Sequence, residues 1–174
     1  MSEARAQRTV YLALGSNLGD RLQNLQSALS RLTTRGRVAA VGGLYETAPS
    51  GVTDQPAFYN AACAFATELA LPALLGFVKQ IEWELGRRPS RFWGPRPCDI
   101  DILLAGEETL HSALLTVPHA RLAERGFVLA PLAEIAPDAT VPGTGATVQA
   151  LWSALPAAER AGVRRVAGPE WALV

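Results

Sequence analysis

The chain has no excess of charge of either sign. Its 16 basic and 16 acidic side chains give a formal net charge of zero over 174 residues, and Lys79 is the one lysine among the basic residues. A neutral chain has no overall field that attracts nucleic acid or an anionic membrane, so any affinity for phosphate must come from a local cluster. We therefore predict a protein without a nucleic-acid or membrane partner, long enough to form one domain with its own core.

Cysteine and long apolar runs are also scarce. The two cysteines, Cys63 and Cys98, each lie in an apolar strand-like run, which predicts buried thiols of a reducing compartment and neither a disulfide nor a metal site. Residues 1–8 contain no apolar run of the kind found in a signal peptide. The longest uncharged apolar stretch, Leu69 to Val78, is far shorter than the roughly 20 residues of a membrane helix. These absences predict a cytoplasmic location.

The rest of the sequence alternates between strand-like and helix-like segments. Apolar residues at helical spacing follow Asp20, a candidate N-cap, and a second such stripe has Pro72 in its first turn and ends at Gly86. Strand-like runs are found at residues 9–14, 38–45, 58–67 and 99–104. This order is the ferredoxin-like βαββαβ pattern, an α+β fold that has a four-stranded antiparallel sheet with two helices on one face.

Residues outside this core are expected to form a tail, loops and further helices. Residues 1–8 are predicted to be a flexible tail and residues 9–174 a single domain. Pro118 to Pro131 suggests a short helix and a turn, and Val148 to Leu155 a last amphipathic helix. The other face of the sheet is then available for mobile loops and ligands. Because this fold has many functions, it does not name one.

Asp99 and Asp101 are the most informative residues. In a strand they share one face with Cα atoms roughly 6.6 Å apart, and a pair of hard oxygen ligands suits Mg²⁺. A D-x-D pair taken alone is more often the solvated face of an edge strand. Here apolar residues continue the strand, and four arginines precede it, namely Arg87, Arg88, Arg91 and Arg96. This combination favours a site for phosphate chemistry.

A series of short motifs gives the chain a family resemblance. They occupy residues 13–20, 45–47, 55–62, 81–82, 85–87, 117–119 and 125–132, together with the run W-G-P-R-x-x-D-x-D-I at residues 93–102. Each motif alone is weak, but their combination and order are very specific. On these motifs the chain resembles the 6-hydroxymethyl-7,8-dihydropterin pyrophosphokinase family of folate biosynthesis.

The resemblance implies an activity and a set of catalytic residues. The family transfers pyrophosphate from ATP to the hydroxymethyl oxygen of the pterin and releases AMP. By this likeness Asp99 and Asp101 hold two Mg²⁺ ions, while Arg87 and Arg96 neutralise phosphate oxygens in the transition state. Arginine suits that role because its planar group binds two phosphate oxygens at once. No covalent nucleophile is needed.

The resemblance also implies two groups of binding residues. For ATP it adds Glu82, Ile102, Thr116, His119 and Arg125 to the two arginines. For the pterin it implies Phe58 and Phe127 as stacking partners, Asn60 as an amide that pairs with the polar edge, and Thr47, Ala48, Ser50 and Trp93 around the ring. Without the resemblance, the two phenylalanines would be read as core residues, His119 as a structural histidine and Glu82 as a solvated carboxylate.

The chain departs from the family pattern near the nucleotide. Pro89 stands where the family often has a second loop arginine, so Arg88 or Arg91 replaces it or the contact is lost. Some members carry an arginine near Leu114, a larger residue at Ala120 and a glutamine at Lys79. These departures concern secondary contacts with ATP.

Two other function classes stay open at this point. Another D-x-D metal enzyme, such as a nucleotidyltransferase or glycosyltransferase, would share the carboxylates but gives no reason for the pterin residues. The second is a non-catalytic ferredoxin-like module that binds RNA or a metabolite, and the neutral charge and the lack of an aromatic RNP-type strand argue against RNA. We expect the protein to act as a monomer.

Overall fold

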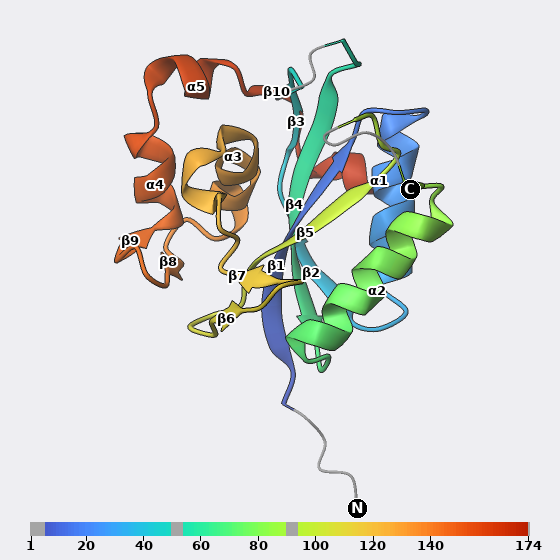
Figure 1. The fold of residues 1–174 in the computed structure, drawn as a ribbon. Helices are drawn as coiled ribbons and strands as arrows, with labels where there is room; N and C mark the ends of the chain where they lie inside the picture. The colour runs from blue at the N-terminus through green and yellow to red at the C-terminus, as the bar shows by residue number, and fades with distance from the viewer. Residues whose placement is uncertain (1–5, 50–53, 90–93, 174) are drawn as a thin grey trace, which may run out of the picture.

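The protein is built on one antiparallel sheet. A computed structural model describes residues 6–49, 54–89 and 94–173. Hydrogen bonds join the strands in the order β10-β3-β4-β1-β5, and β2 also pairs with β4 (Figure 1). The bounds are β1 Arg8–Ser16, β2 Arg37–Val41, β3 Leu44–Thr47, β4 Phe58–Thr67, β5 Asp99–Leu104 and β10 Arg164–Ala167.

Helices cover both faces of this sheet (Figure 1). The first face carries α1 (Arg21–Leu32) and α2 (Leu71–Glu84), which bury one apolar core against β1, β4 and β5. The second face carries α3 (Gly126–Ile135), which with α4 (Val148–Ala154) buries a second, smaller core. The ferredoxin-like α+β fold is therefore confirmed. The sheet has six strands rather than the predicted four, and helices cover both faces rather than one, so the face expected to be open is partly covered.

Local sequence signals explain where the first two helices begin and end. The Asp20 side chain accepts a hydrogen bond from the Gln23 N–H at 3.0 Å and so caps α1. In α2 a proline occupies the first turn, where its missing N–H has no intrahelical partner to lose. Gly86 follows that helix at φ +101°, a conformation that side chains other than glycine rarely adopt. The predicted cap and stop are both confirmed.

The single strand predicted over residues 38–45 is wrong, because Gly42 and Gly43 divide it into β2 and β3. A Cβ atom on Gly42 would lie 2.6 Å from the carbonyl oxygen of Pro131 in α3. The Gly43 N–H donates to the Glu134 carboxylate at 2.9 Å. The glycine pair thus allows α3 to approach the sheet backbone, and the strand breaks at that point.

Gly42→Ala is expected to destabilise the fold by about 1–3 kcal/mol, since the new methyl group meets helix backbone that cannot move aside cheaply. Gly76→Ala is the matched control, because nothing lies within 4 Å of its added Cβ in α2. That control should gain about 0.5–1 kcal/mol from helix propensity. Urea denaturation measures both, and equal effects of the two changes would contradict the close approach.

The C-terminal region contains more structure than the sequence indicates. Residues 148–155 were predicted to form the last helix, but α4 is followed by α5 (Ala157–Ala161), β10 and a 3₁₀ turn, η2 (Pro169–Ala172). Strand β10 adds an edge to β3. Short pieces complete the chain, namely β6 (Leu110–His111), β7 (Thr116–Val117), η1 (Leu122–Glu124), β8 (Thr140–Val141) and β9 (Ala146–Thr147).

The burial predictions for cysteine are confirmed. Cys63 and Cys98 are free and buried, and burial raises the pKa of the Cys63 thiol to about 12.

Within the described ranges, no helix has both the length and the apolar character needed to cross a membrane.

Candidate active site

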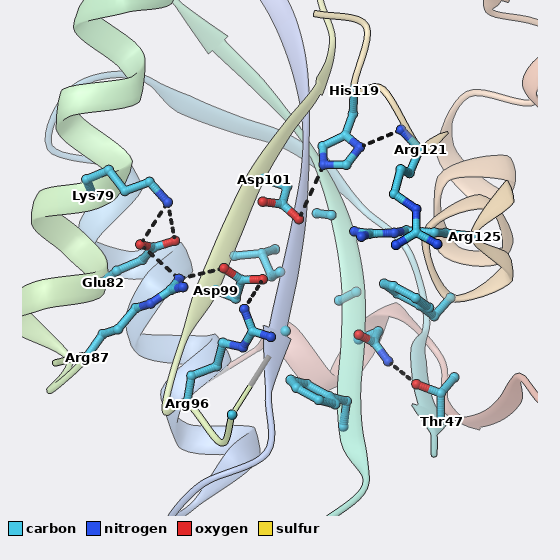
Figure 2. Close-up of a pocket in the computed structure, with 18 of the residues that line it drawn as sticks. Thr47, Lys79, Glu82, Arg87, Arg96, Asp99, Asp101, His119, Arg121 and Arg125 are labelled. Carbon is cyan, nitrogen blue, oxygen red and sulfur yellow. Dashed lines mark hydrogen bonds and ion pairs between the residues drawn. The ribbon is translucent and has the colours of Figure 1, made fainter. Parts of the chain in front are cut away.

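A cavity of about 900 Å³ lies on the second face of the sheet, beside the first turn of α3, and extends past β5 to α2 (Figure 2). Its lining brings together twelve of the residues singled out from the sequence. They are Thr47, Ala48, Phe58, Asn60, Glu82, Arg87, Arg96, Asp99, Asp101, His119, Arg125 and Phe127.

Strand register explains why residues so far apart in sequence meet here. Gly15 of β1 is opposite Asn60 of β4 on one side and Asp99 of β5 on the other. In the same way Thr47 of β3 is opposite Phe58. Alternate residues of a strand share a face, so four neighbouring strands present their polar and aromatic residues to one floor. Gly15 has no side chain, which leaves space between Asn60 and Phe58.

Asp99 is held by two arginines at one end of the cavity. Arg87 Nη1 donates to one of its carboxylate oxygens at 2.6 Å, and Arg96 Nη1 lies 3.4 Å from the other (Figure 2). Arg87 follows the end of α2, and Arg96 precedes β5. The Arg96 Nε atom is buried and has no hydrogen-bond partner within the described part of the chain. This arginine therefore has donor capacity that a bound oxyanion could use.

Asp101 occupies the next position on the same face of β5. Burial, with the nearby charge of Asp99, raises the pKa of Asp101 to about 7. The His119 Nε2 atom lies 4.0 Å from this carboxylate, and its Nδ1 accepts from the Arg121 backbone N–H at 3.1 Å. A neutral imidazole so held carries its proton on Nε2, facing Asp101. Burial and the Arg125 guanidinium lower the pKa of His119, which favours that neutral form.

The two carboxylates fit a magnesium site that is completed by its substrate. Within the described residues, no group of three or more histidine, cysteine or acidic side chains could hold a metal ion. Asp99 and Asp101 are the acidic side chains of the strand floor that would hold a metal ion in this cavity. Mg²⁺ is bound by one or two carboxylates together with water and substrate phosphates, so this incomplete donor set suits it better than zinc or calcium.

The raised pKa of Asp101 predicts a pH-dependent stability. Its ordinary value is 3.8 and its folded value about 7. Between these values the folded protein keeps a proton that the unfolded chain has released, so the contribution of Asp101 to stability falls as pH rises. Asp101→Asn should thus have little effect on the melting temperature near pH 4 and should raise it increasingly towards pH 8. Calorimetry in EDTA measures this, and a pH-independent difference would contradict it.

Glu82 is not the solvated carboxylate that the sequence alone suggests. It is 2% exposed, and its Oε1 accepts from the Ile100 N–H at 2.8 Å. Arg87 and Lys79 lie 3.1 and 3.2 Å from its Oε2. Burial raises the pKa of Glu82, against the lowering effect of the Ile100 N–H. Glu82 therefore anchors α2 to β5 and orients Arg87.

The opposite end of the cavity is flat and aromatic. Phe58 comes from β4 and Phe127 from the first turn of α3, and both rings are half-buried. The Asn60 Nδ2 donates to the Thr47 hydroxyl at 2.7 Å, which fixes the orientation of the amide. A planar ligand between the rings would meet this amide with its edge. Both phenylalanines line the cavity, and Phe127 also packs against the second core.

Two of the residues chosen from the sequence, Ile102 and Thr116, do not line this cavity. Ile102 is 2% exposed in the core under α1 and α2, because its position in β5 has the opposite parity to Asp99 and Asp101. Thr116 lies in the β6–β7 hairpin and is absent from the lining. Ser50 and Trp93 lie outside the described residues.

Arg88, one of the two candidates for the missing loop arginine, is bound to the end of α2. Its Nη1 donates to the carbonyl oxygens of Trp83 and Arg87 at 2.8 and 2.7 Å, and its guanidinium stacks 3.8 Å from the Trp83 ring centroid. The other candidate, Arg91, lies outside the described residues.

Sequence reasoning missed Arg121 and Glu159, which also line the cavity. Glu159 comes from α5 and accepts from the Gly126 N–H at 3.3 Å. The C-terminal segment gives no motif that signals this approach. For Arg121, its position two residues after His119 was the available signal.

Known proteins resemble the chain in both sequence and fold. The sequence model described as 7,8-dihydro-6-hydroxymethylpterin-pyrophosphokinase matches residues 11–137. The Bacillus subtilis protein named 2-amino-4-hydroxy-6-hydroxymethyldihydropteridine pyrophosphokinase is 48% identical over 127 residues, covering 72% of this chain and 76% of that protein. Its namesake from Pseudomonas aeruginosa is 45% identical over 135 residues, covering 76% and 83%.

Longer proteins contain a similar segment. The mitochondrial folate synthesis bifunctional protein of Pisum sativum is 47% identical over 127 residues, and the chain spans only 25% of its length. The solved HPPK-DHPS of Plasmodium falciparum with pteroate has a TM-score of 0.70 at 17% identity, covering 88% of this chain and 43% of that one. At that identity the likeness supports the fold alone. The extent of the sequence match shows that the chain belongs to the 7,8-dihydro-6-hydroxymethylpterin-pyrophosphokinase family.

Proposed function

We propose that the protein transfers pyrophosphate from ATP to the hydroxymethyl group of 6-hydroxymethyl-7,8-dihydropterin, in a Mg²⁺-dependent step of folate biosynthesis that releases AMP. The observation that carries the proposal is the division of one cavity into two chemically different ends. One end has Asp99 and Asp101 beside arginines, and the other has two half-buried rings beside an oriented amide (Figure 2).

In this proposal the charged end binds the triphosphate. Asp99 and Asp101 would hold two Mg²⁺ ions, which supply positive charge to the phosphate oxygens. Arg87 and Arg96 bind the same oxygens as charge spreads in the transition state, and Arg125 and His119 bind from the opposite side. Within the same proposal Glu82 acts by fixing Arg87. Ile102 contacts the nucleotide through its backbone, and Thr116 does so from the β6–β7 hairpin.

The aromatic end binds the acceptor and orients its hydroxyl group. Phe58 and Phe127 stack on the pterin, which adds roughly 0.5–1.5 kcal/mol beyond the buried area, and Asn60 pairs with the ring edge. Thr47 and Ala48, with Ser50 and Trp93, surround the same ring. The hydroxyl oxygen then bonds to the β-phosphorus, the bond from that phosphorus to the bridging oxygen of the α-phosphate breaks, and the hydroxyl proton is released. Positioning and electrostatics carry this reaction without a covalent intermediate.

Mass spectrometry of the products tests the proposal directly. With ATP, MgCl₂ and 6-hydroxymethyl-7,8-dihydropterin, AMP and the pterin pyrophosphate should appear in equal amounts, and EDTA should stop both. ADP would indicate a simple kinase, and free pyrophosphate with a nucleotidylated product would indicate a nucleotidyltransferase. The proposal would be overturned if the pterin did not bind in the cavity, or if adding it did not stimulate AMP formation.

Phe127→Ala should weaken pterin binding by about tenfold, because it removes one stacking partner together with its buried area. The affinity for ATP should change little, since the charged end is intact. Calorimetric titration of each substrate measures the two effects. An unchanged pterin affinity would limit Phe127 to its packing against the second core.

We also propose that the protein acts as a cytoplasmic monomer without a nucleic-acid or membrane partner. The neutral net charge supports the absence of nucleic-acid and membrane partners, since it offers no overall field that would attract either. Light scattering coupled to gel filtration measures the oligomeric state, and a stable dimer would contradict it.

A further inference from the structure

Asn17 follows the last residue of β1 and is 1% exposed. Its side-chain amide makes three hydrogen bonds. Nδ2 donates to the Gln55 side-chain oxygen at 2.8 Å and to the Pro56 carbonyl oxygen at 3.1 Å, while Oδ1 accepts from the Arg96 N–H at 2.9 Å. The Asn17 N–H also donates to the Arg96 carbonyl oxygen at 3.2 Å. One residue therefore joins three segments of the chain.

These segments lead to the charged and the aromatic parts of the cavity. Gln55 and Pro56 directly precede β4, which begins at Phe58, and Arg96 lies beside Asp99. The Arg96 guanidinium is also 5.6 Å from the Phe58 ring centroid. Asn17 thus fixes the backbone of Arg96. The segment that leads into the aromatic end in turn fixes Asn17.

The chemistry of the amide explains why asparagine suits this position. The link needs two donors and one acceptor in one short planar group, which asparagine supplies. Alanine supplies neither, and aspartate keeps the acceptor but loses both donors. The buried groups around it would otherwise stay unpaired, so the site is sensitive to this residue.

We propose that Asn17 is a positioning residue, which holds Arg96 against the phosphate site and connects its position to the segment preceding Phe58. The inference rests on the proposed function, since it takes Arg96 as the phosphate-binding arginine. Asn17 touches neither substrate. It acts by keeping Arg96 in register with Asp99, and a small displacement of a positioned group can cost up to about 10²-fold in rate.

A double-mutant cycle on kcat tests the inference. Asn17→Ala should lower kcat by about thirtyfold with a much smaller change in pterin KM, and should have almost no further effect when Arg96→Ala is already present. Asn17→Asp should restore part of kcat, because it still accepts from the Arg96 N–H. Equal losses in the two backgrounds would overturn the proposal, since they would indicate a general structural effect.

Matched controls separate this proposal from the proposed function. Gln26→Ala removes another side-chain amide, which donates to the Trp171 carbonyl oxygen at 2.7 Å, and should change kcat by less than about twofold. If Arg96→Ala leaves kcat unchanged, the proposed role of Arg96 fails. If Arg96→Ala slows the reaction and Asn17→Ala slows it further by its full factor, only the inference about Asn17 fails.

Hydrogen exchange tests the same contacts without the reaction. In the folded Asn17→Ala protein, the amide of Arg96 and the peptide covering residues 54–57 should exchange faster than in the parent protein. Asn17→Asp should restore protection at Arg96 but not at residues 54–57. Unchanged exchange at Arg96 in Asn17→Ala would overturn the proposal whatever reaction the protein catalyses.

Discussion

Asp99→Ala is expected to lower kcat by at least about a thousandfold, because it removes one of the two proposed metal ligands and the shared acceptor of Arg87 and Arg96. Without the carboxylate, Arg96 loses its ion pair and the two guanidinium groups repel each other, while Glu82 still holds Arg87. The substituted side chain lies on the cavity face of β5, so the strand and its buried apolar residues should persist. Single-turnover assays over a range of Mg²⁺ concentrations measure the loss.

Asp101→Ala should show a loss of similar size, since the pair acts as one site. Circular dichroism and thermal melting must show that each variant is folded. Appreciable turnover of either variant at ordinary Mg²⁺ concentrations would contradict the metal assignment. Rescue at very high Mg²⁺ would instead support it, because a weakened site can still be filled by mass action.

Arg96→Ala is expected to slow the chemical step by about 10²–10³-fold while weakening pterin binding far less. The reason is geometric. Its guanidinium lies beside Asp99, and its buried Nε has no partner among the described residues, so its unused donor is available for a transferring phosphate. Its contact with the aromatic end is indirect, because its guanidinium lies 5.6 Å from the Phe58 ring centroid.

Rapid-quench kinetics and pterin titration separate the two effects on Arg96→Ala. Arg37→Ala, an exposed arginine on β2, is the matched control and should leave both quantities unchanged. If Arg96→Ala weakened pterin binding but kept the rate of the chemical step, Arg96 would instead belong to the pterin-binding part of the site.

The fold was predictable where local signals were strong. The strand expected at residues 58–67 has the bounds of β4, because a run of small and apolar residues follows the loop that contains Pro56 and ends before Glu68. Strand β10 was not predictable, since four residues with two arginines have no clear periodicity. The burial of Glu82 was also hidden, because the N–H of Ile100 that it binds comes from another part of the chain.

The candidate site was likewise predictable only in part. Residue patterns alone led to the carboxylates and arginines, since charge and strand parity can be followed along a short segment. The aromatic end came only from the family resemblance, because Phe58 and Phe127 meet through tertiary structure. Parity also explains why the Ile102 side chain is buried in the first core, whereas nothing local marks Asn17 as a junction of three segments.

Strand β10 bears on how the protein can be divided experimentally. The family match ends at residue 137, but β10 forms the outer edge beside β3, which carries Thr47. Arg165 also binds Glu134 of α3 at 3.0 Å, and Trp171 donates to the Gly42 carbonyl oxygen at 2.8 Å. A fragment cut at the end of the family match would expose an unpaired sheet edge next to the aromatic end of the cavity, and such edges promote aggregation. The smallest useful expression unit therefore extends through Trp171.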